Sequence, residues 1–130
     1  MKHTVRLLTA IAGTALCAAC ATTPADSKLR QYQDQLATNT QRFNACTEGL
    51  LKHYASSAST DDEKVIERTL KQCAVYASNT CSSQVQLDDY IAGRKVTSAP
   101  NRAAAESACL ASLTTARRVT LLNALVDIRP

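Results

Sequence analysis

The chain has 130 residues, which suits one domain and not two. Glycine and proline occur three times each and aromatic residues make up 4%, which argues against a β-sandwich or barrel. The net charge is +4, but Lys2 and Arg6 supply two of these charges, so the rest of the chain is nearly neutral and offers no basic face for nucleic acid.

Residues 1–19 are predicted to be a secretory signal peptide. A basic start at residues 1–6 precedes an apolar run at residues 7–19 that ends in small residues. The run is shorter than the roughly 20 apolar residues that cross a bilayer, so a spanning helix is disfavoured. The alternative is an ordinary amino-terminal helix.

The end of this run, Ala18-Ala19-Cys20, resembles a bacterial lipobox. In that motif small residues precede a cysteine that receives fatty-acyl chains and becomes the mature amino terminus, so Cys20 is the predicted lipidation site. The alternative is ordinary cleavage after Ala21, because Ala19-Cys20-Ala21 fits the A-x-A pattern. That cleavage would leave a soluble periplasmic protein.

Residues 20–26 form the predicted tether, and residues 27–130 the folded domain, which opens with a helix over residues 27–54. Thr23-Pro24 supplies a helix start. Gly49 is a weak point that costs about 1 kcal/mol relative to alanine. Two sets of residues recur every seven positions, which is an a/d seam expected to be buried against other helices. They are Leu29, Leu36, Phe43 and Leu50, interleaved with Tyr32, Asn39, Cys46 and His53.

Two further helices are predicted. The second covers residues 60–93, with Thr60 and Glu63 spaced as a capping box and Gly93 as the stop. Weak helix formers around Asn79 favour a kink or break there. The third covers residues 102–127, and its basic pair Arg117-Arg118 is expected on the solvated face.

Cys46, Cys73, Cys81 and Cys109 remain after the leader, and an oxidising compartment favours disulfides between them. Four cysteines allow three connectivities. Cys46–Cys73 and Cys81–Cys109 rank first, because the midpoint of each pair falls in a predicted loop, as for facing residues of a helical hairpin. Cys46–Cys81 with Cys73–Cys109 fits less well. Cys73–Cys81 would need a broken helix, since eight helical residues span about 12 Å.

No catalytic, metal or cofactor site is predicted. His53 is the one histidine outside the leader, and it is interpreted as a partly exposed seam residue near a helix end and not as a base. Acidic residues at 61–63 and 88–89 fit a helix start and a solvated face. The chain lacks a Cys-x-x-Cys pair, a phosphate-binding glycine loop and a G-x-S-x-G elbow. An enzyme is therefore the least favoured interpretation.

Two short segments carry a family resemblance: Asn44-Ala45-Cys46, and the nine residues from Cys109 to Arg117. They resemble the first and last cysteine motifs of a family of small helical envelope proteins that includes lysozyme-inhibitor lipoproteins. A C-x-x-x-L-T-x-x-R segment opens the final helix turns of that family, and Leu113, Thr114 and Arg117 match it. The resemblance implies a helical, disulfide-linked fold.

The sequence therefore predicts an all-α, three-helix antiparallel bundle stapled by two disulfides, after a cleaved signal peptide. The expected location is the bacterial cell envelope, anchored in the membrane by lipid and facing the periplasm. The expected function is that of a non-enzymatic protein-binding or structural module that contacts an envelope protein through one helical face. The alternative is an inhibitor or immunity-type protein against an envelope-attacking enzyme such as lysozyme. No metal, cofactor or nucleic-acid partner is expected.

Overall fold

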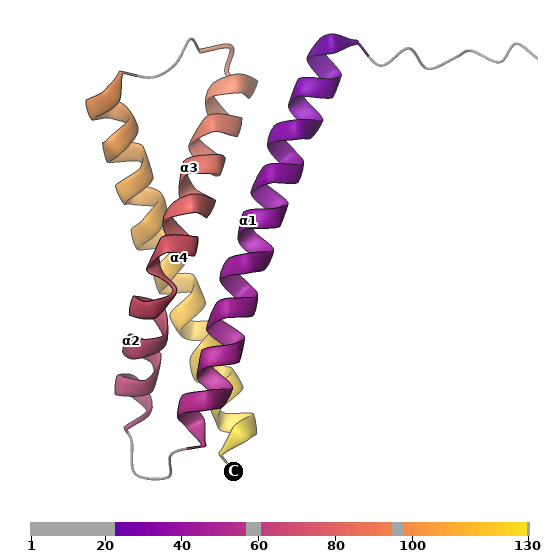
Figure 1. The fold of residues 1–130 in the computed structure, drawn as a ribbon. Helices are drawn as coiled ribbons and strands as arrows, with labels where there is room; N and C mark the ends of the chain where they lie inside the picture. The colour runs from indigo at the N-terminus through magenta and orange to yellow at the C-terminus, as the bar shows by residue number, and fades with distance from the viewer. Residues whose placement is uncertain (1–22, 57–60, 95–97, 130) are drawn as a thin grey trace, which may run out of the picture.

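The computed structural model describes residues 23–56, 61–94 and 98–129, and these residues form four α-helices and no strand (Figure 1). The helices are α1 (Pro24–Ala55), α2 (Asp62–Gln72), α3 (Ala74–Ile91) and α4 (Ala99–Ile128). The all-α prediction is confirmed for this part of the chain. The predicted leader and the lipidation site Cys20 lie outside the described residues.

α1 begins at Pro24 and not at residue 27, because Thr23 caps it. The Thr23 hydroxyl accepts a hydrogen bond from the backbone N–H of Asp26 at 3.3 Å, and the missing N–H of Pro24 is not needed in the first turn. Asp26 near the start and Lys52 near the end suit the helix dipole. Local sequence signals therefore account for this helix start.

The structure has two helices, α2 and α3, where one was predicted, so the predicted count of three becomes four. The interruption is at Cys73, which has φ −92° and ψ 8°, and not near Asn79. The weak helix formers around Asn79 remain helical because Ala77, Thr80 and Cys81 are buried there. Tertiary packing outweighs local propensity in this segment.

The interruption at Cys73 separates two packing environments. α2 buries a single stripe through Val65, Ile66 and Thr69. α3 lies between α1 and α4 and buries residues on a wider face (Figure 1). One regular helix would keep one stripe throughout, so the break lets the residues after Cys73 meet neighbours on two sides.

The remaining helix ends follow local rules. Asp61 is the N-cap of α2, and its carboxylate accepts a hydrogen bond from the N–H of Glu63 at 3.2 Å. The predicted cap Thr60 lies outside the described residues. Gly93 follows α3 with φ +64°, a left-handed conformation that favours glycine, so the predicted stop is confirmed. α4 begins at Ala99 with Pro100 in its first turn.

The bundle has two unlike halves. In the closed half, residues 43–55 of α1, all of α2 and residues 110–128 of α4 converge (Figure 1). In the open half, residues 24–42 of α1, 78–91 of α3 and 99–109 of α4 spread apart toward their far ends (Figure 1). They remain linked by hydrogen bonds from the Tyr90 hydroxyl to the Ala25 carbonyl at 2.8 Å and from Arg102 to the Ser82 hydroxyl at 3.0 Å.

The closed half holds both apolar clusters of the core. One consists of Leu51, Ala55, Val65, Ile66, Leu121 and Leu125, and the other of Phe43, Cys73 and Ala77. The buried apolar residues of the open half are Cys81, Val85 and Leu87.

The a/d seam describes α1 only in part. Phe43 is buried as predicted, but Leu36 is only half-buried. His53, expected to be partly exposed, is exposed. The other buried residues of α1 are Thr47 and Leu51, one position beyond the seam residues Cys46 and Leu50, and Ala55, two positions beyond His53. A straight helix with 3.6 residues per turn drifts about 20° per heptad from a seven-residue seam, so the buried stripe moves to the adjacent row.

Two disulfides cross-link the helices. Cys46 pairs with Cys73 at a Cα–Cα distance of 6.0 Å, and Cys81 pairs with Cys109 at 5.6 Å. These are the pairs whose midpoints fall in the predicted loops. The first joins α1 to the junction of α2 and α3, and the second joins α3 to α4. Disulfides are typical of compartments outside the cytoplasm.

Candidate functional site

Among the predicted site residues, those that the structure describes contribute to the fold and form no catalytic or metal-binding group. Cys46, Cys73, Cys81 and Cys109 form two disulfides. His53 is exposed at the end of α1, with its ring centroid 5.2 Å from that of Tyr54. Within residues 23–56, 61–94 and 98–129, no group of three or more histidine, cysteine, aspartate or glutamate residues is arranged to hold a metal ion.

The acidic clusters are tied to helix ends and to neighbouring basic residues. Asp62 pairs with Arg129 at 2.6 Å, and Glu63 pairs with Arg118. Arg129 also donates to the carbonyl oxygen of Ala55 at 3.0 Å, so it fastens the end of α4 to α1 and α2. These carboxylates hold the closed half together.

Arg117 is the clearest departure from the sequence analysis. Its side chain is only 11% exposed, and it reaches from α4 to α1, where it donates to the Thr47 hydroxyl at 2.8 Å. It also donates to the carbonyl oxygen of Asn44 at 3.1 Å and pairs with Glu48 at 3.0 Å. The predicted solvated position of Arg117 is therefore wrong, because α1 supplies polar partners that a helix-face pattern does not reveal.

The other residues that carry the family resemblance also serve the fold. Leu113 packs against the cluster around Phe43, and Thr114 donates from its hydroxyl to the carbonyl oxygen of Leu110 at 2.7 Å. Leu113 and Arg117 thus position α4 against α1, whereas the Thr114 hydroxyl bonds within α4 itself. In this chain the matched segment therefore has structural roles.

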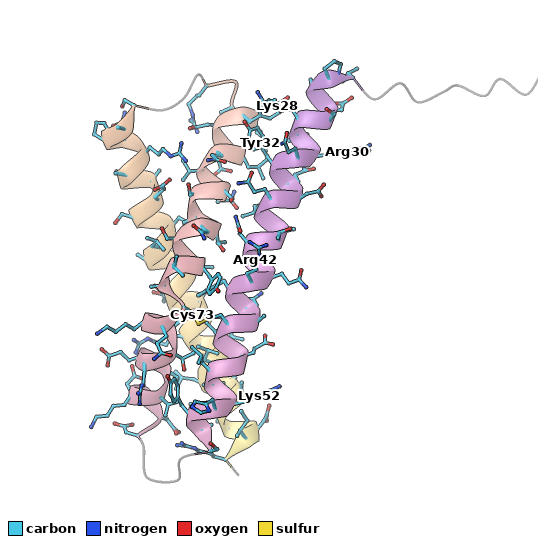
Figure 2. The ribbon with its side chains drawn as sticks, viewed as in Figure 1. Lys28, Arg30, Tyr32, Arg42, Lys52 and Cys73 are labelled. Carbon is cyan, nitrogen blue, oxygen red and sulfur yellow. A yellow bond between two sulfur atoms is a disulfide. The ribbon has the colours of Figure 1, made fainter. Side chains whose placement is uncertain are left out.

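A groove between α1 and the start of α3 is the strongest candidate for a binding site. It measures about 630 Å³. α1 supplies five of its residues at helical spacing, so they share one face, and α3 supplies one. The lining consists of Arg42, Ala45, Cys46, Gly49, Leu50 and Tyr76. Figure 2 shows Arg42 on the middle of α1, with Cys73 nearby at the start of α3.

Gly49 lies on the wall of the groove, facing open space. A Cβ atom added at Gly49 would meet no other atom within 4 Å, so the glycine is not required by close packing. It nevertheless lowers the stability of an exposed helix interior by about 1 kcal/mol. The sequence marked Gly49 as a weak point, and the structure places it on the wall of the groove.

Arg42 and Tyr76 give the groove its polar character. Among the described residues, Arg42 makes no ion pair, and the Tyr76 hydroxyl makes no hydrogen bond. Tyr76 is 38% exposed, and its neighbour Val75 is 60% exposed. Within the described residues, the groove therefore combines an apolar base with one cation and one hydroxyl that have no partner, an arrangement suited to binding.

A second hollow lies in the open half, between α1 and the end of α3. It measures about 310 Å³ and contains Lys28, Tyr32 and Tyr90, the last two with ring centroids 5.3 Å apart. The Tyr90 hydroxyl donates to the carbonyl oxygen of Ala25 at 2.8 Å. Arg94 lines the same hollow and is paired with Asp89 at 3.0 Å. Since these polar groups are largely engaged, this hollow is the weaker candidate.

The sequence analysis missed Arg42 and Tyr76 because neither belongs to a motif. Their only signal is that α1 and α3 bring them to one groove, which depends on the packing of the two helices. No described helix is both long and apolar enough to cross a membrane. Comparison with protein-family models, curated proteins and solved structures finds no match to this chain.

Proposed function

We propose that this chain is a small bacterial cell-envelope lipoprotein whose mature part is a non-enzymatic protein-binding module. The groove between α1 and α3 carries the proposal, because its open apolar surface is flanked by Arg42, which pairs with no acidic residue in the part of the chain that the structure describes. Apolar concavities with a few placed polar groups are the usual form of binding sites.

The groove chemistry indicates the kind of segment that would fit. An apolar side chain of the partner would occupy the space beside Gly49 and Leu50. A carboxylate of the same segment would pair with Arg42, whose planar guanidinium matches carboxylate geometry. The partner is therefore an envelope protein with an apolar residue next to an acidic one on its surface.

A steric block tests this proposal. Gly49→Phe fills the groove with a bulky side chain, whereas Gly49→Ala adds one methyl group that meets no neighbour. We expect the parent protein and Gly49→Ala to retain the same partner from envelope extract, and Gly49→Phe to lose it. Arg42→Glu should also lose it, and the exposed control Lys52→Glu should not. A partner retained equally by Gly49→Phe and Arg42→Glu would contradict the proposal.

The proposed anchor is a lipid on Cys20. The leader with its apolar run, the small residues before Cys20 and the polar tether support it. Cys20→Ser should move the protein from the membrane fraction to the soluble periplasm or stall its processing. A parent protein that is already soluble would favour cleavage after Ala21 and would leave the groove proposal intact.

The same retention experiment separates the binding module from an inhibitor or immunity-type protein. A hydrolase or toxin among the proteins retained by the parent and lost with Gly49→Phe would identify the inhibitor. Inhibition of that enzyme by the purified parent, and not by Gly49→Phe, would then place the activity in the groove.

A further inference from the structure

α4 presents a face that no other described part of the chain covers. Seven exposed residues without charge form this face, here called the α4 stripe: Ala104, Ala108, Ala111, Thr115, Val119, Leu122 and Val126. Its three large residues are 56%, 38% and 71% exposed, in that order. An exposed helix face usually carries charged residues, as α1 does with Arg30, Asp34 and Lys52. The α4 stripe therefore has the composition of a contact surface.

The spacing of the α4 stripe keeps it straight along the helix. Its positions repeat after eleven residues, from Ala104 to Thr115 to Val126. Eleven residues in three turns correspond to about 3.67 residues per turn, close to the 3.6 of a straight α-helix. The stripe runs for about 33 Å along α4. A second straight helix could follow it over this whole length.

The α4 stripe complements itself when the second copy runs in the opposite direction. About a two-fold axis at Thr115, each alanine meets a large side chain and each large side chain meets an alanine. The pairs are Ala104 with Val126, Ala108 with Leu122, and Ala111 with Val119, with Thr115 facing its own copy. A parallel pair would instead join small to small at one end and large to large at the other. Uniform helix separation therefore favours the antiparallel arrangement.

The residue on the axis suits burial. The Thr115 hydroxyl donates to the carbonyl oxygen of Ala111 at 2.8 Å within its own helix. Two facing copies of Thr115 can thus meet through their methyl groups without leaving a hydroxyl proton unpaired.

We propose that two copies of this chain associate through antiparallel contact of their α4 stripes. Half of the lateral surface of a helix about 33 Å long and about 10–12 Å wide is roughly 500–600 Å². The dimer would then bury about 1,000–1,200 Å² in total, at the lower end of specific interfaces. The association is a concentration-dependent equilibrium between monomer and dimer. It uses α4, whereas the groove lies between α1 and α3 and the proposed anchor precedes α1, so it stands independently of the proposed function.

The oligomeric state of the purified mature protein tests the proposal. Sedimentation over a concentration series should show a reversible shift from monomer to dimer. Leu122→Glu places a charge in the stripe and should remove the dimer, while Thr120→Glu, an exposed control of α4 outside the stripe, should keep it. Unchanged circular dichroism would show that both variants fold. A monomer at every concentration, or a dimer that persists in Leu122→Glu, would overturn the proposal.

Disulfide trapping tests the direction of the helices, in a Cys17→Ser, Cys20→Ser background that leaves only the four paired cysteines. Thr115→Cys should cross-link to its own copy faster than the off-stripe control Thr120→Cys. Ala104→Cys should cross-link in a mixture with Val126→Cys and not with itself. Self-cross-linking of Ala104→Cys as fast as that of Thr115→Cys would indicate a parallel pair and would overturn the antiparallel arrangement.

Discussion

The closed and open halves of the bundle are held by different kinds of contact. In the closed half, large apolar residues such as Phe43, Ile66 and Leu121 are fully or almost fully buried. In the open half, the buried residues of α3 include only two larger aliphatic side chains, Val85 and Leu87. Helix contacts there also depend on side-chain hydrogen bonds, such as that from Asn39 to Ser83 at 2.8 Å. Apolar burial stabilises in proportion to area, so most of the folding free energy should come from the closed half.

The two disulfides sharpen this contrast. Cys46–Cys73 lies in the closed half and Cys81–Cys109 in the open half, and their sequence separations are nearly equal, at 27 and 28 residues. The chain-entropy model therefore predicts that the two disulfides raise the free energy of unfolding by similar amounts. Their local effects differ, because the first reinforces an apolar core, whereas the second joins α3 to α4 where large apolar contacts are sparse.

The largest effect is expected from Phe43→Ala. Phe43 is fully buried, so the loss of its side chain should lower the free energy of unfolding by about 3–5 kcal/mol. Leu36→Ala, at a half-buried position of the open half, should cost clearly less. Urea denaturation measures both, with the exposed Lys52→Ala as control. Equal losses for Phe43→Ala and Leu36→Ala would contradict the division into two halves.

Removing one disulfide at a time is the next test. Cys46→Ser with Cys73→Ser, and Cys81→Ser with Cys109→Ser, should each cost about 3–4 kcal/mol in the chain-entropy model. Hydrogen exchange should distinguish them, because only the second pair of changes should accelerate exchange across residues 99–109 of α4. The same exchange pattern in both variants would mean that the two halves unfold as one unit.

Arg117→Ala probes the polar link in the closed half. The guanidinium is mostly buried and donates to Thr47 and Asn44, so its loss should cost about 2–3 kcal/mol. Arg117→Lys should recover only part of this, since an ammonium cannot reproduce the forked geometry. Thermal denaturation provides the comparison. If Arg117→Ala lowers the melting temperature no more than Lys52→Ala does, the buried contacts of Arg117 do not stabilise the fold, and the side chain behaves as a solvated one.

The smallest effect is expected from Asn39→Ala in the open half. Asn39 donates to the Ser83 hydroxyl and, at 3.4 Å, to the carbonyl oxygen of Asn79. Its loss should cost about 1 kcal/mol. A double-mutant cycle with Ser83→Ala measures the coupling, which should be positive and below the effect of Phe43→Ala. Strictly additive single changes would show that this contact does not hold α1 to α3.

Local signals in the sequence determined that the chain is helical and where several of its helices begin or end. Thr23 with Pro24 starts α1, and Gly93 stops α3, because capping and left-handed conformations depend on residues close in the chain. The spacing of the four cysteines singled out the pairs that the structure brings together, because the geometry of a helical hairpin fixes which residues face each other.

Only the tertiary structure decided the break at Cys73, the burial of Arg117 and the groove beside Gly49. Each depends on a neighbour distant in the sequence. α3 turns a wider face toward two helices, Thr47 and Asn44 supply partners to Arg117, and Tyr76 closes one side of the groove. A helical pattern gives the face on which a residue lies, but which helix covers that face is set by three-dimensional packing.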